Sequence, residues 1–138
     1  MIQSISFIIL HLNSKAEDLQ QCRQSIEVQK IPDFEVHVLS PASPQSFASA
    51  LNLKCASIKK DYIVLMDSDV ILGSDWYTHL KNADFFDLIG TTLRDKNGSR
   101  IVDWFHMRTF RNLLIPYPLN YDEWSPNACV SGALLTFR

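Results

Sequence analysis

The chain has 138 residues, of which 46% are hydrophobic and 20% are charged, with a formal net charge of −2. This length fits one domain, residues 1–138, with enough apolar side chains to form a core. The small net charge and scattered Lys and Arg residues give no electrostatic case for binding nucleic acid, and no apolar run approaches the roughly 20 residues that span a bilayer.

The first half of the chain predicts a β-α-β-α-β unit. Apolar runs without clean alternation indicate strands covered on both faces, and apolar residues at helical spacing indicate helices between them. The expected segments are strands at 4–10, 34–39 and 61–67 and helices at 15–29 and 45–59. Ser14 and Glu17 form the S-x-x-E signature of a capping box at the first helix, and Ser43-Pro44 suits the start of the second. Short connections imply a right-handed, doubly wound, mostly parallel sheet.

The pattern changes beyond the third strand. A short helix is expected over about residues 75–82. Two apolar segments flank the tight-turn signal Asn97-Gly98 and predict an antiparallel hairpin added to the sheet. Residues 109–127 contain three prolines among aromatic residues and predict an irregular segment, and "ACVSGALLTFR" predicts one final strand.

Two carboxylates follow the third strand directly. The apolar run stops at Asp67, and Asp69 follows beyond one small residue. Ligands of doubly wound sheets bind beyond the carboxyl ends of the strands, where residues 11–13 and Ser40 are also expected. Two such carboxylates can hold one Mg²⁺ or Mn²⁺, whose remaining ligands come from phosphate oxygens. The alternative is that both aspartates cap the turn and the short helix that follow.

Several motifs together resemble the family 2 glycosyltransferases of the GT-A fold. They are "SISFIILHLN", "CRQSI", "LN" at 51–52, "YIVLMDSDV" and "VSGALLTFR", spread over residues 4–76 and 130–138. The resemblance implies a three-layer α/β sandwich in which Asp67 and Asp69 hold Mn²⁺ or Mg²⁺ on the diphosphate of a UDP-, GDP- or dTDP-sugar. It further implies inverting transfer of the sugar to a hydroxyl of a glycan or lipid-linked acceptor.

The resemblance also implies a set of donor-binding positions: His11, Leu12, Asn13, Ser40, Asn52, Asp67, Ser68 and Asp69. Two positions depart from the family pattern. Ser40 stands where the family usually has an acid that hydrogen-bonds the base, and Leu51 stands where it has an arginine near the phosphates. His106 is a candidate third metal ligand, with a structural, hydrogen-bonded histidine as its alternative.

The general base is the part of the site that the sequence leaves open. In the family it comes from an acidic motif downstream of the "VSGALL" strand, and this chain ends at Arg138 before any such motif. We therefore expect a short or C-terminally truncated member. Asp122 and Glu123 are the candidate bases within the chain, and the alternative for both is an ordinary surface loop.

Two rival functions are kept. A non-catalytic relative or fragment would bind the nucleotide and transfer nothing. A flavodoxin-like receiver module would use Asp67 as phosphoacceptor, but it carries an acid pair at the end of its first strand, where this chain has "HLN". Three widely spaced cysteines predict reduced thiols and a cytoplasmic location, with peripheral attachment to a membrane as the alternative.

Overall fold

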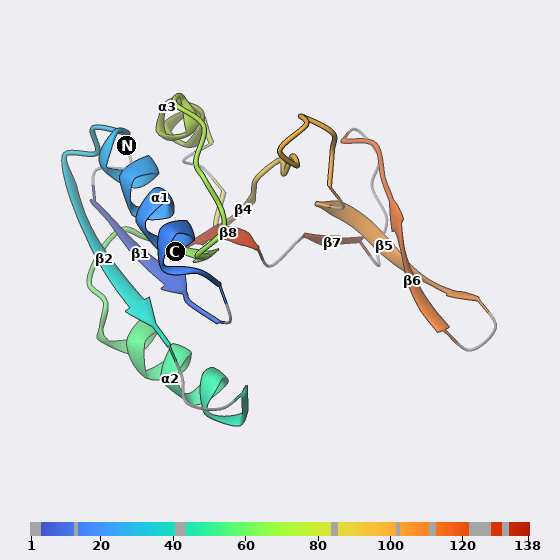
Figure 1. The fold of residues 1–138 in the computed structure, drawn as a ribbon, viewed down its shortest axis with the longest axis horizontal. Helices are drawn as coiled ribbons and strands as arrows, with labels where there is room; N and C mark the ends of the chain where they lie inside the picture. Colours follow the sequence, from blue (N-terminus) through green and yellow to red (C-terminus); the bar gives the residue numbers. More distant parts are fainter. Residues whose placement is uncertain are drawn as a thin grey trace.

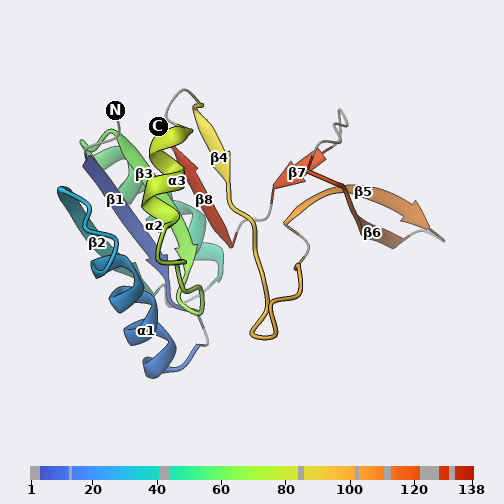
Figure 2. The same cartoon turned by 90° about the horizontal axis from the view of Figure 1, so that it is seen from above.

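The computed structural model describes residues 4–12, 14–40, 44–83, 86–101, 103–110, 113–121, 128–130 and 133–138. Within them the backbone forms two β-sheets and three helices (Figure 1). The main sheet has five strands in the order β2-β1-β3-β8-β4 (Figure 2). The elements of this part are β1 (Ser4–Leu10), α1 (Ala16–Glu27), β2 (Asp33–Leu39), α2 (Pro44–Ser57), β3 (Tyr62–Asp67), α3 (Trp76–Asn82), β4 (Leu88–Gly90) and β8 (Leu134–Phe137).

The sheet is mostly parallel and is wound in two directions from β1. β1 pairs in parallel with β2 on one side and with β3 on the other. β8 is antiparallel to both β3 and β4, so β8 alone runs against the other four strands. α1 and α2 connect strands in opposite directions across β1, and right-handed crossovers place such helices on opposite faces of a sheet. The predicted β-α-β-α-β unit and the mixed α/β class are confirmed.

Each face of the sheet has its own apolar core. Phe7 and Ile9 of β1 pack with residues of α1 and α3, such as Cys22 and Trp76. Ile8 and Leu10, which point the other way, pack with α2. Since both faces are covered, β1 is apolar at five of its seven positions, including four in succession, rather than at alternate ones. None of the described helices is long and apolar enough to cross a membrane.

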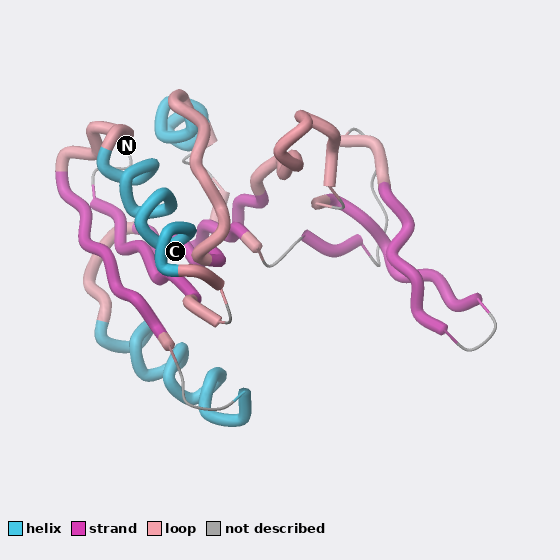
Figure 3. The backbone as a smooth tube through the Cα atoms, in the orientation of Figure 1, coloured by secondary structure: helices cyan, strands magenta, loops and turns pink. Residues whose placement is uncertain are grey.

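The second sheet was not predicted. β5 (Trp104–Phe110), β6 (Leu113–Pro118) and β7 (Ala128–Val130) form an antiparallel sheet in the order β6-β5-β7. It lies apart from the main sheet, and the long loop after β4 leads to it (Figure 3). The irregular segment expected over 109–127 is therefore wrong for 109–110 and 113–118. Pro116 and Pro118 are tolerated because β6 is an edge strand, where a missing N–H costs no central ladder bond.

Two further expectations are corrected. The turn at Asn97-Gly98 exists, but it adds no hairpin to the main sheet, because its arms meet only in an isolated bridge between Arg94 and Arg100. "ACVSGALLTFR" is not one strand, since it contributes β7 to the second sheet and β8 to the main sheet. These partners are set by long-range pairing, which local periodicity does not encode.

Candidate functional site

The acidic pair lies where the connections of the main sheet diverge. α1 leads from β1 to β2 and α2 leads back to β3, so the junction of β1 and β3 is the topological switch point, where such sheets bind ligands. Hydrogen bonds hold the backbone here on both sides. The Ser68 N–H donates to the Leu10 carbonyl at 3.0 Å, and the Asp67 N–H donates to the Ala133 carbonyl at 3.0 Å.

Two polar side chains, Ser25 on α1 and Gln29 just beyond its end, fix the loop that follows the pair. The Gln29 side chain donates to the Gly73 carbonyl at 2.9 Å and accepts from the Tyr77 N–H at 3.1 Å. The Ser25 hydroxyl accepts from the Leu72 N–H at 3.0 Å. Both side chains are buried. Sequence reasoning missed them, although their spacing continues the helical repeat of the buried residues Cys22 and Ile26.

A cluster of two hydroxyls and one imidazole adjoins the pair. His11 Nδ1 lies 3.1 Å from Ser68 Oγ and 3.0 Å from Ser14 Oγ, and the two hydroxyls are hydrogen-bonded to each other. The predicted capping role of Ser14 is wrong. α1 starts one residue later, with Lys15 as N-cap, and the Lys15 N–H donates to the Asp18 carboxylate at 3.1 Å. The Ser14 hydroxyl therefore belongs to the site.

Two cavities meet at the acidic pair. The smaller has a volume of about 200 Å³ and is lined by Leu10, Leu12, Ser14, Asp67, Ser68 and Asp69. The larger has a volume of about 580 Å³, shares Asp67 and Asp69 with the first, and adds Arg94 and Lys96 from the loop after β4. The larger volume is in the range of pockets that hold cofactors and other small ligands. Both carboxylates thus border two hollows from one edge of the sheet.

The charges of the pair suit a cation. Asp67 is half-buried and Asp69 is exposed. Burial raises the pKa of Asp67, and the negative charge of Asp69 raises it further. A divalent cation would offset both effects, and carboxylate oxygens are the donors that Mg²⁺ and Mn²⁺ prefer. Among the described residues no cluster of three or more His, Cys, Asp or Glu side chains could hold a metal.

The other candidate residues lie outside this cluster. Ser40 is exposed just after β2, and Asn52 is exposed on α2. Neither lines the two cavities as far as the described residues define them. His106 is in β5, but its side chain is not among those described. Three further candidates lie outside the described residues: Asn13, Asp122 and Glu123.

Comparisons with known proteins assign no family. No protein-family model matches the chain, and no curated protein matches its sequence.

Proposed function

We propose that this chain is a metal-dependent glycosyltransferase domain of the GT-A type, which binds a nucleotide sugar at the acidic pair and transfers the sugar to a hydroxyl acceptor. One observation carries the proposal: Asp67 and Asp69 border both cavities at the switch point of the sheet. A diphosphate is repelled by two carboxylates unless a cation lies between them, so a divalent metal is part of the proposal.

The residues at the site divide into two groups. Asp67 and Asp69 would hold Mg²⁺ or Mn²⁺, which when bound stabilises the negative charge that develops on the departing diphosphate. The smaller cavity would accept the nucleoside. Leu12, whose side chain is 46% exposed, offers the base an apolar surface, and the hydroxyls of Ser14 and Ser68 offer hydrogen-bond partners.

The proposed transfer is a direct displacement. The acceptor oxygen forms a bond to the anomeric carbon while the bond from that carbon to the diphosphate oxygen breaks. The electron pair of the broken bond leaves with the diphosphate, and the acceptor proton passes to a general base. Asp122 and Glu123 remain the candidates for that base. The acceptor is proposed to be a glycan or a lipid-linked hydroxyl compound.

The strand β8 favours this function over a receiver module. Sheets of the receiver type are wound in the order 2-1-3-4-5 with parallel strands. Here β8 is antiparallel and lies directly beside β3. In addition, β1 is followed by His11 and an exposed Leu12 rather than by a pair of acids.

The donor site is tested by thermal unfolding with UDP, GDP, CDP and dTDP, each with Mn²⁺ or with EDTA. A ligand that binds only the folded state raises the midpoint temperature of unfolding. At a free ligand concentration of a hundred times Kd, the gain in free energy of unfolding is about 2.7 kcal/mol. We expect a rise that requires Mn²⁺ and disappears in the variant Asp67→Asn/Asp69→Asn. Asp75→Asn, an exposed aspartate in the next loop, is the matched control and should keep the rise. No rise with any nucleotide would refute the donor site.

Catalysis is tested separately from binding. Nucleoside diphosphate release from UDP-, GDP- and dTDP-sugars is followed with alkyl glycosides as acceptors. Release that depends on both Mn²⁺ and Asp67 is expected. Binding without release in any combination would favour the non-catalytic relative.

A further inference from the structure

The loop after β4 folds into a tight hairpin, residues 93–101, that forms one wall of the larger cavity. The Ile101 N–H donates to the Leu93 carbonyl at 3.0 Å, and the Asp95 N–H donates to the Ser99 carbonyl at 2.8 Å. Gly98 has a φ of 81°, the left-handed conformation that a glycine adopts without strain. The hairpin therefore has a defined shape although it joins neither sheet.

Inside the hairpin, the acidic and basic side chains have different roles. Asp95 Oδ1 accepts from the N–H groups of Asn97 and Ser99, at 2.8 Å and 2.9 Å, so this carboxylate is engaged with the turn itself. Arg94 donates to the Gly98 carbonyl at 2.8 Å, which uses one of the five N–H groups of a guanidinium. Arg94 and Lys96 both line the cavity that also contains the acidic pair.

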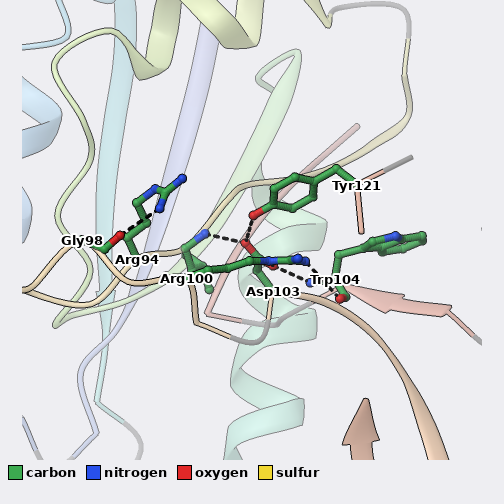
Figure 4. Close-up of polar contacts among 7 residues, drawn as sticks. Arg94, Gly98, Arg100, Asp103, Trp104 and Tyr121 are labelled. Atoms are coloured by element: carbon green, nitrogen blue, oxygen red, sulfur yellow. Dashed lines mark hydrogen bonds and ion pairs between the residues drawn. The ribbon is translucent and has the colours of Figure 1, made fainter. Parts of the chain in front are cut away.

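A buried carboxylate anchors the base of the hairpin. Asp103, whose side chain is 2% exposed, accepts at one oxygen from the Leu93 N–H and the Tyr121 hydroxyl, at 2.9 Å and 2.8 Å. Its other oxygen accepts from Arg100 Nε and the Trp104 N–H, both at 2.8 Å (Figure 4). The Arg100 guanidinium also lies 4.1 Å from the centre of the Tyr121 ring. Both arms of the hairpin are therefore tied to one group.

These contacts also explain the ionisation of the anchor. Burial alone would raise the pKa of Asp103, but the hydrogen bonds that it accepts from the Leu93 N–H, from Tyr121 and from Arg100 lower the pKa below its ordinary value. The anchor stays charged near neutral pH, and charged acceptors form the stronger hydrogen bonds. The wall that carries Arg94 and Lys96 is therefore set in place before any ligand binds.

We propose that Arg94 and Lys96 form a phosphate-binding wall, which takes the negative charge of a nucleoside diphosphate across the cavity from Asp67 and Asp69. This proposal rests on the proposed function above. A nucleoside diphosphate carries more negative charge than one divalent cation neutralises, so the remainder needs protein cations. The hairpin supplies such cations from a part of the chain distant from Asp67 and Asp69.

The test is calorimetric titration of nucleoside diphosphate into the protein in the presence of Mn²⁺, with the base identified by the thermal screen. The variants are Arg94→Gln, Lys96→Gln and the double variant. Lys59→Gln is the matched control, because Lys59 is exposed and precedes β3 at the opposite end of the strand. Each single variant should weaken diphosphate binding about tenfold, as expected for one hydrogen bond to a charged group. The control should bind as the wild type does.

A parallel titration with the nucleoside alone separates charge recognition from structural damage. Its affinity should be unchanged in all variants, and Arg94→Lys should recover part of the diphosphate affinity that Arg94→Gln loses. The difference between wild type and the double variant should shrink at high salt, as screening requires for partly exposed charges.

Each contrary result has a distinct meaning. Wild-type binding that needs Mn²⁺ but is unaffected by the double variant would overturn the phosphate-binding wall and leave the donor site standing. An equal loss for nucleoside and diphosphate would overturn it as well, since the hairpin would then act only on local structure. No diphosphate binding by the wild type would overturn both this proposal and the proposed function.

Discussion

The two walls of the candidate site are stabilised in different ways. The acidic pair is carried by β3, which is packed on both faces by apolar side chains and paired along its length with β1. The base of the hairpin is held by hydrogen bonds that converge on the single carboxylate of Asp103, and its turn is held by a few further hydrogen bonds of its own. Apolar burial is spread over many residues, whereas the contacts at the base of the hairpin share one side chain. The comparison suggests that the acidic wall withstands local damage and that the basic wall does not.

The largest effect is expected in the apolar scaffold. Phe7 is fully buried, and its ring contacts the rings of Phe34 and Trp76, with centroids 6.4 Å and 5.9 Å away. Phe7→Ala should lower the free energy of unfolding by about 3–5 kcal/mol, the usual cost of such a cavity. Urea denaturation measures it. Ile8→Val, in the same strand, should cost only about 1 kcal/mol. If Phe7→Ala lowered the free energy of unfolding by less than about 1 kcal/mol, apolar packing would not be what stabilises this wall.

An intermediate effect is expected at the anchor. Asp103→Asn removes the charge that four donors share, and we expect a loss of about 2 kcal/mol. The loss should be local. Amide exchange should quicken at Leu93 and Trp104 while β1 and β3 keep their protection. Asp87→Asn, at a side chain that is 88% exposed, is the control. Exchange that quickened equally in β1 and β3 would show that the two walls unfold as one cooperative unit, which would contradict the difference in their stabilisation.

The smallest effect is expected at Asp67, and it depends on pH. Its folded-state pKa lies above the ordinary value of 3.8 because of burial and the charge of Asp69. The folded state therefore binds this proton more tightly than the unfolded state, and the wild type loses stability as pH rises from 3.8 through the raised pKa. Asp67→Asn avoids that loss, so at neutral pH without metal it should be more stable, by at most about 1 kcal/mol for a solvent-screened group.

That pH effect is measured as the difference in unfolding midpoint between wild type and Asp67→Asn from pH 4 to pH 8 in EDTA. The difference should grow with pH, and saturating Mn²⁺ should reverse it, because only the wild type gains from the cation. A difference that is constant with pH would mean that burial does not disfavour the Asp67 charge.

The scaffold could be predicted from the sequence because its signals are local. Apolar runs and short connections define the parallel unit, and parallel topology then places Asp67 and Asp69 at the ligand-binding edge. Ser14 and Gln29 were not found this way, because they reach the site through contacts with Ser68 and Tyr77, which are distant in the chain. Arg94 was not found because its only described side-chain hydrogen bond is local, and its place on the cavity wall is set by the tertiary fold. The second sheet was missed for a related reason. Prolines predict a break when only the local sequence is considered, but they are tolerated in β6 because tertiary pairing makes it an edge strand.

Cys22 adds a further property to the acidic wall. Its thiol is fully buried on α1 and donates to the Asp67 carbonyl at 3.9 Å. Burial, with a smaller contribution from Asp69, raises the pKa of this thiol to about 11. Roughly one thiol in ten thousand is then ionised at pH 7, and it is the thiolate that attacks an alkylating reagent. Labelling of Cys22 should therefore require α1 to separate from β3. The labelling rate, measured by mass spectrometry under native conditions, then reports how often the acidic wall opens.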